Sequence, residues 1–188
     1  MLNNLFPKVR PRRLRKNKTI RDLVSETKLF KSKLIQPLFV SDSNSQKIEI
    51  EAMPGQYVHT KETLFKEVDE LLNLGIKTIA LFPNISKNLK DSNGTEALNP
   101  ENFLCGLVSE LKNKFPELIL ITDVALDPYT DSGHDGIIIG GEVDNDETLK
   151  SLESMSLNLA HSGSDIIAPS DMMDGRVGII RKALEAEN

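Results

Sequence analysis

The 188-residue sequence contains no tryptophan, a single cysteine and no apolar run long enough to cross a membrane. A lone cysteine excludes an internal disulfide, which agrees with a reducing compartment, and we expect a cytoplasmic protein. The first residues lack the apolar core of a signal peptide. A hydrophobic fraction of 39% with 27% charged residues is ordinary for a globular domain.

Several common site motifs are also absent. No glycine-rich dinucleotide loop or phosphate loop follows an apolar run, and neither EF-hand spacing nor a pair of histidines at zinc spacing occurs. The sequence therefore offers no generic nucleotide, calcium or zinc motif.

Acidic residues are missing from the first 18 positions, which form a basic arm. These positions hold seven lysine and arginine residues and therefore carry a charge of +7. Since the net charge of the whole chain is −5, the other 170 residues together carry −12. Such an arm could bind nucleic acid, contact another subunit or remain solvated. We favour a subunit contact, since the acidic body repels phosphate backbones and no nucleic-acid reading motif follows the arm.

Four short apolar runs predict strands that are buried on both faces. They span 34–40, 77–83, 118–124 and 164–170. Helical patterns lie between or beside these runs, at 19–30, 60–74, 99–115, 146–161 and 174–187. Gly75 is a suitable stop for the second helix, and Asn99 followed by Pro100 is a suitable start for the third. A Pro54-Gly55 turn predicts a β-excursion after the first strand.

The regular alternation of strand and helix predicts a parallel α/β fold. The runs begin 43, 41 and 46 residues apart. Two architectures use units of this length, the open doubly wound sheet and the (β/α)8 barrel. Eight units of about 43 residues need roughly 340 residues, so in the barrel case the chain supplies about four βα units.

Polar residues at the carboxyl ends of predicted strands are the main functional signal, because ligand sites of parallel sheets lie at this edge. Asp123 ends the third run, and Ser170 and Asp171 end the fourth. Aspartates recur every fourth residue from Asp123 through Asp127 and Asp131 to Asp135, with His134 beside the last. Clustered carboxylates favour Mg²⁺ or a similar cation over zinc, although a solvated turn has the same composition.

The other reactive side chains are interpreted as structural. Cys105 lies among apolar residues of a predicted helix and is expected to fill space in the core. We expect capping or solvent exposure for His59 and His161, and core packing for Met172 and Met173.

Two segments resemble the porphobilinogen synthase (5-aminolevulinate dehydratase) family. They are DVALDPYTDSGHDG and, about 30 residues later, the family signature APSDMMDGRV. RPRRLR, QPLFV, AMPG, ALFP and NPENF…FPEL also occur in the family's order, so the resemblance covers essentially the whole chain.

The resemblance implies a (β/α)8 TIM barrel with an N-terminal arm that wraps a neighbouring subunit, usually in an octamer. It implies a lyase that condenses two 5-aminolevulinate molecules to porphobilinogen with loss of two waters, in haem and other tetrapyrrole biosynthesis. Two lysines of that family form Schiff bases with the substrates, in SAK and KPG segments downstream of the signature. The sequence contains neither segment, and we expect the 188-residue chain alone to be inactive.

The resemblance also implies roles for residues that are present. Asp123, Ser170 and Asp171 are expected to support catalysis near the substrates. Cysteines of zinc-type members are replaced here by Ala125, Asp127 and Asp135, which argues against zinc. Asp127 and Asp135 are then expected to hold Mg²⁺, a monovalent cation or a substrate amine.

Two domain-level hypotheses follow from this reading. In the first, residues 1–18 form the arm and 19–188 form the N-terminal half of a barrel enzyme. In the second, the chain is a catalytically inactive structural or oligomerisation partner of a full-length subunit. Neither hypothesis predicts a nucleic-acid or membrane partner.

Overall fold

The computed structural model describes residues 8–42 and 45–187. The chain divides into two compact units, Met1–Lys33 and Leu34–Asn188. The sequence-based division at residue 18 therefore differs from the structural one, and residues 19–33 belong to the first unit. Residues 1–7 of the expected arm lie outside the described part of the chain.

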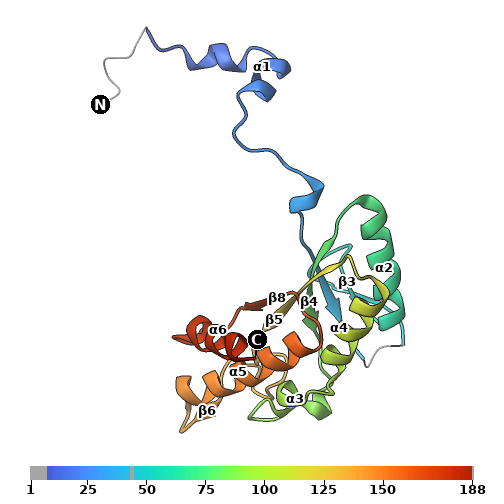
Figure 1. Ribbon diagram of the computed structural model, residues 1–188, viewed down its shortest axis with the longest axis vertical. Helices are drawn as coiled ribbons and strands as arrows, with labels where there is room; N and C mark the ends of the chain where they lie inside the picture. Colours follow the sequence, from blue (N-terminus) through green and yellow to red (C-terminus); the bar gives the residue numbers. More distant parts are fainter. Residues whose placement is uncertain (1–7, 43–44, 188) are drawn as a thin grey trace. The chain divides into compact units, whose positions relative to one another are not determined.

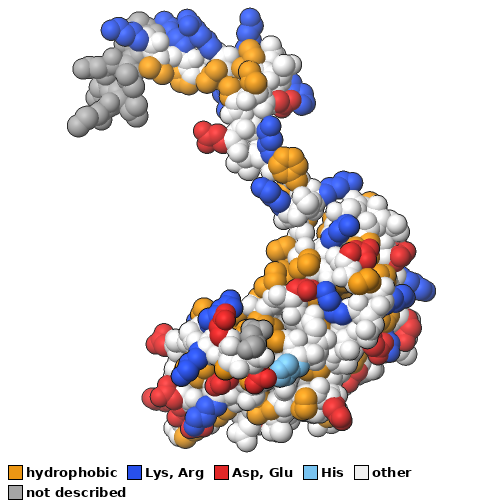
Figure 2. Space-filling view, in the orientation of Figure 1, with side chains coloured by type: hydrophobic (Ala, Val, Ile, Leu, Met, Phe, Trp, Pro, Cys, Tyr) orange, Lys and Arg blue, Asp and Glu red, His pale blue; other side chains and the backbone are white. Residues whose placement is uncertain are grey.

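The N-terminal unit contains three short helices, the 3₁₀ turns η1 (Pro11–Arg15) and η2 (Lys31–Lys33) and the α-helix α1 (Lys18–Leu23). The Asn17 side chain caps α1 by accepting the Ile20 N–H at 2.9 Å. The helix is shorter than the predicted 19–30, because none of its residues is buried and a short helix gains little without packing. Figure 2 shows apolar side chains of this unit exposed among its basic ones; the exposed apolar residues are Val9, Leu14, Leu23, Val24, Leu29 and Phe30.

A six-stranded sheet organises the second unit, in the order β2-β3-β1-β4-β5-β8 (Figure 1). The four strands predicted from the apolar runs are present as β1 (Gln36–Val40), β4 (Thr78–Pro83), β5 (Ile119–Val124) and β8 (Ile166–Pro169). They pair in parallel, whereas β2 (Ile48–Glu49) runs antiparallel to β3 (Tyr57–His59) in the predicted excursion. The fold is thus mixed α/β with a largely parallel sheet.

The remaining elements are five helices, a 3₁₀ turn and a small hairpin. They are α2 (Lys61–Leu74), η3 (Lys87–Leu89), α3 (Thr95–Leu98), α4 (Phe103–Lys114), β6 (Ile138–Ile139), β7 (Glu142–Val143), α5 (Asn145–His161) and α6 (Arg176–Ala186). Gly75 ends α2 in the left-handed conformation, as predicted.

The predicted start of α4 is wrong. Pro100 disfavours helical geometry at Asn99, which is extended and accepts the Glu101 N–H at 3.0 Å. Asn102 is the residue that caps α4, through the Cys105 N–H at 2.9 Å.

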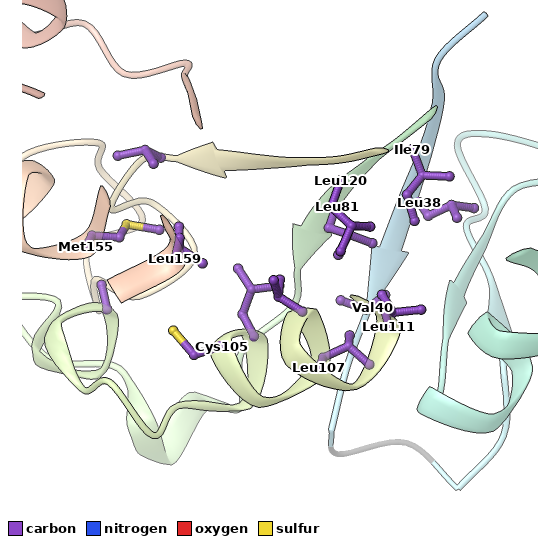
Figure 3. Close-up of a cluster of buried hydrophobic side chains, with 14 of the residues drawn as sticks. Leu38, Val40, Ile79, Leu81, Cys105, Leu107, Leu111, Leu120, Met155 and Leu159 are labelled. Carbon is purple, nitrogen blue, oxygen red and sulfur yellow. The ribbon is translucent and has the colours of Figure 1, made fainter. Parts of the chain in front are cut away.

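One hydrophobic core joins the helices to one face of the sheet. Alternate residues of β4, Ile79 and Leu81, are fully buried against it. Figure 3 shows Leu107 and Leu111 of α4 in this core, together with strand residues Leu38, Val40, Ile79, Leu81 and Leu120. Cys105 and Met173 are buried here as predicted, whereas Met172 is exposed. By the same alternation, Asp123 lies on the face of β5 opposite that of Leu120.

Within residues 8–42 and 45–187, no helix combines the length and the apolar character that a bilayer span requires.

Candidate active site at the carboxyl edge of the sheet

Parallel pairing brings the carboxyl ends of β1, β4, β5 and β8 to one edge of the sheet. At this edge the Asn84 N–H donates to the Val40 carbonyl at 2.7 Å, and the Ser41 N–H donates to the His59 carbonyl at 3.0 Å. These bonds continue the ladder just beyond the strands and hold the first residues of the loops. The residues that follow β1 and β4 therefore start from fixed backbone positions.

Asp123 lies at the end of β5, paired with Ala168 of β8. Its Oδ1 atom is buried and has no hydrogen-bond partner among the described residues. Burial raises the pKa of this carboxyl, and hydrogen bonds from the Ser170 hydroxyl and backbone act in the opposite direction. Burying a carboxyl oxygen without a hydrogen-bond partner lowers the stability of the fold. Such atoms are found where a bound ligand supplies the missing hydrogen bond.

Asp171 is 3% exposed and organises the turn between β8 and α6. Its Oδ1 accepts the Met173 N–H at 2.7 Å, and its Oδ2 lies 3.2 Å from Nε of Arg176 without the alignment of a hydrogen bond. Burial raises the pKa of Asp171, while the Met173 N–H and the Arg176 charge oppose the rise. Arg176 was not predicted, although its place five residues after Asp171 in the signature is a usable signal. Ser170 itself is exposed.

The acid-rich loop after β5 is ordered by backbone bonds. Asp91 and Thr130 form an isolated parallel bridge, and the Thr130 hydroxyl donates to the His134 carbonyl at 2.8 Å. Tyr129 is fully buried, and burial raises the pKa of its phenol. The loop is therefore folded rather than a solvated turn, although Asp131 remains exposed.

The charge of Asp135 acts on three other carboxyl groups. It raises the pKa values of Asp123, Asp127 and Asp171, in each case after the larger effect of burial. Four of the sequence-predicted or motif aspartates are therefore linked through their charges. Lys90, which sequence reasoning missed, lowers the pKa of Asp127 slightly by its charge. It lies next to η3, in the loop after β4.

The donor set was tested for a metal ion. Within the described residues, no group of three or more histidine, cysteine, aspartate or glutamate side chains is arranged to hold one. Ala125 presents only a buried methyl group where zinc-type members have a cysteine. The described residues therefore do not complete a metal site by themselves.

The remaining predicted residues lie elsewhere. His59 is 3% exposed at the end of β3, so the expectation of solvent exposure is wrong for it; burial lowers its pKa. His161 ends α5 and is exposed, with Nε2 3.3 Å from Glu187. Lys77 precedes β4, and none of the described lysines lies within the last residues of β1, β4, β5 or β8.

A parallel sheet with helices on one face and polar groups at its carboxyl edge defines an α/β protein of the class that binds ligands at that edge. Comparison with known proteins makes the assignment specific. The family model described as delta-aminolevulinic acid dehydratase matches residues 8–188, and the chain belongs to this family.

Individual relatives agree with the family assignment. The chain is 48% identical to a delta-aminolevulinic acid dehydratase of Chlamydia pneumoniae over 94% of its own length and 53% of the relative's. A Bradyrhizobium diazoefficiens relative of the same name is 45% identical, over 94% of this chain and 50% of the relative. The chain spans about half the length of these curated relatives.

A solved structure matches with a TM-score of 0.92 and 44% identity, over 95% of this chain and 51% of the other. It is the Toxoplasma gondii delta-aminolevulinic acid dehydratase (porphobilinogen synthase) in complex with the reaction product porphobilinogen.

Proposed function

We propose that the protein contributes the carboxylate-bearing half of a porphobilinogen synthase site, where two 5-aminolevulinate molecules condense to porphobilinogen with loss of two waters. The observation that carries this proposal is the buried, unpartnered Oδ1 of Asp123 at the carboxyl end of β5. The similar Toxoplasma gondii structure, solved with porphobilinogen, supports the same reaction.

The three supporting residues have different roles in this proposal. Asp123, whose pKa is raised by burial, can exchange a proton with an amine or carbonyl group of the substrate. Ser170 is exposed next to it and supplies a hydroxyl that can relay a proton. Asp171 is turned inward and fixes the backbone of its own loop.

The imine-forming amines of this reaction come from elsewhere in the proposal. A Schiff base needs a lysine kept partly neutral by its site, and none of the described lysines lies within β1, β4, β5 or β8. We propose that the 188-residue chain alone does not turn over substrate. The alternative, a structural partner of a complete subunit, shares this expectation and differs in predicting no substrate affinity.

The half-barrel expectation has support from β8. Its outer edge is unpaired in the described sheet, and Ile166 is 45% exposed there. An open apolar edge of a parallel sheet is normally covered by a further strand. We propose that β1, β4, β5 and β8 are the first four strands of a (β/α)8 barrel.

The N-terminal unit is proposed to mediate homo-oligomerisation, as an octamer by family. Its described residues, 8–33, expose apolar and basic side chains together, and its helices contain no buried residue, so this part of the unit shows no core of its own. Deleting residues 1–17 should reduce the oligomer size measured by light scattering; unchanged assembly would contradict this role.

A cation at Asp127 and Asp135 remains a proposal. Burial and, after it, repulsion from Asp135 raise the pKa of Asp127, and a bound Mg²⁺, monovalent cation or substrate ammonium group would relieve that repulsion. The absence of a cysteine from this loop supports the expectation that zinc is not used. A cytoplasmic location is proposed on the single, reduced and buried Cys105.

A chimaera tests the proposed function. Residues 1–188 would be fused to the part of the Chlamydia pneumoniae relative that lies beyond the matched region. We expect the purified fusion to form porphobilinogen from 5-aminolevulinate in a colorimetric assay, and Asp123→Ala in the same fusion to lower kcat/KM by at least about 100-fold. Glu185→Ala, on an exposed face of α6, is the matched control and should retain activity. A folded fusion without activity would overturn the proposal.

A further inference from the structure

The backbone of Gly136 packs so closely that no side chain fits there. A Cβ atom on this residue would lie 2.6 Å from Cγ1 of Val143, 2.9 Å from Cε of Met173 and 3.1 Å from Oγ1 of Thr148. The methionine tip could move, but the branched side chain of Val143 has little freedom. Gly136 therefore joins three segments in one contact: the β6–β7 hairpin, the β8–α6 loop and the first turn of α5.

Thr148 holds the residue after Gly136. Its hydroxyl is fully buried, accepts the Ile137 N–H at 2.9 Å and donates to the Asp144 carbonyl at 2.6 Å. The Asp144 N–H in turn donates to the Ile137 carbonyl at 2.8 Å. These three residues form a closed ring of hydrogen bonds, in which the Thr148 hydroxyl uses both its donor and its acceptor capacity.

The start of α5 also holds the second loop of the site. The Asn145 side chain accepts the Asp174 N–H at 2.8 Å and donates to the Asp174 carbonyl at 3.3 Å, as a backbone partner would. Met173, next to Asp174, is held by the Asp171 carboxylate and by Arg176, which donates to the Met173 carbonyl at 2.9 Å. The first turn of α5 therefore fixes both loops against one another.

We propose that Thr148 is a positioning residue, which sets the place of the Asp135 carboxylate relative to Asp171 by holding Ile137 and the backbone of Gly136. The position of the Asp135 carboxylate depends on the backbone of Gly136, because Asp135 directly precedes Gly136 in the chain. The expected effect on substrate binding rests on the proposed function, whereas the expected effect on the position of the Asp135 loop does not. Gly136, next to Asp135, packs against Met173, whose N–H is bound by Asp171, so the placement of Gly136 bears on the separation of the two carboxylates.

The test compares Thr148→Val with Thr148→Ser. Valine keeps the shape of threonine but leaves the Ile137 N–H without an acceptor, whereas serine keeps the hydroxyl. Ser156→Ala is the matched control, since Ser156 is also fully buried on α5 and bonds only to its own helix, at the Leu152 carbonyl.

Two measurements on the full chain need no substrate. We expect Thr148→Val to speed amide hydrogen exchange at Ile137 by at least about 10-fold and to weaken the proton NOE between the Met173 methyl group and Gly136. Thr148→Ser should restore both, and Ser156→Ala should change neither. Unchanged exchange and NOE in Thr148→Val, or equal changes in Ser156→Ala, would overturn the proposal. If Thr148→Val does not fold, Gly136→Ala provides the same NOE and exchange comparison, and an undisturbed loop in that variant would also overturn it.

A third measurement separates this proposal from the proposed function. In the active fusion, Thr148→Val should raise KM for 5-aminolevulinate by about 10-fold with a smaller change in kcat, and Thr148→Ser should return KM to the parent value. If Thr148→Val displaces the loop but KM is unchanged, Asp135 has no role in substrate binding, and Thr148 still positions the loop. An inactive parent fusion would count against the proposed function only.

Discussion

The two ends of β5 and β8 are built in opposite ways. At the amino end, the Asp165 carboxylate accepts the Lys112 ammonium group at 2.9 and 3.0 Å and the Leu120 N–H at 2.8 Å. Lys112 also donates to the Leu118 carbonyl at 2.9 Å. At this end the two strands and α4 are tied together by satisfied polar groups.

At the carboxyl end, polar groups are buried without being satisfied. Five buried side-chain atoms of the described residues lack a hydrogen-bond partner. Four belong to carboxyl strand ends or to the loops that follow them, and the fifth to the first residue of α6: Asp123 Oδ1, Asp171 Oδ2, His59 Nδ1, Tyr129 Oη and Arg176 Nε. A fold tolerates unsatisfied groups where a ligand or a neighbouring segment completes them. We propose that the amino edge of the sheet serves stability and the carboxyl edge serves binding.

The largest expected effect comes from the core between the two ends. Leu120 is fully buried in β5, and Leu120→Ala should lower the free energy of unfolding by about 2–5 kcal/mol. Because the strand is shared, both ends should lose protection together in hydrogen exchange during denaturant unfolding. Earlier exposure of the carboxyl-edge loops alone would show that the two ends are separate cooperative units.

The strands and most helices were predictable because burial imposes a clear apolar pattern on them. The runs behind β4 and β5 are near-continuous, and α2 shows both its apolar face and its Gly75 stop. The start of α4 was misplaced because Asn99 and Asn102 are both acceptable caps, and only the turn at Pro100 decides between them.

The site was predictable only in part. Asp123 and Asp171 could be found because each interrupts or ends an apolar strand. The roles of Thr148 and Gly136 could not, since they depend on contacts between segments distant in the sequence. The N-terminal unit was the least predictable region, because no burial constrains where α1 ends.

A moderate effect is expected from the amino end. Asp165→Ala removes the Lys112 ion pair and leaves the Leu120 N–H without its acceptor, so we expect a loss of about 1–2 kcal/mol, reduced by the partial exposure of both side chains. Substrate affinity should not change. The control is Glu185→Ala, which breaks an exposed ion pair on α6 and should have little effect. Loss of 5-aminolevulinate binding in Asp165→Ala would contradict the division between the two edges.

The smallest effect on stability, and one of opposite sign, is expected at the carboxyl end. Burial raises the pKa of Asp123 above its ordinary value of 3.8, so between 3.8 and the raised value the folded state binds more protons than the unfolded state. This contribution favours the folded state below that window and is lost as pH rises through the folded-state pKa. Asp123→Asn, which cannot ionise, should therefore match the parent near pH 3.5 and be more stable than the parent at pH 7. Denaturant titrations at both pH values measure the difference. A variant that is less stable than the parent at pH 7 would show that the Asp123 carboxylate is satisfied in the folded protein and that the contrast between the two ends fails at this residue.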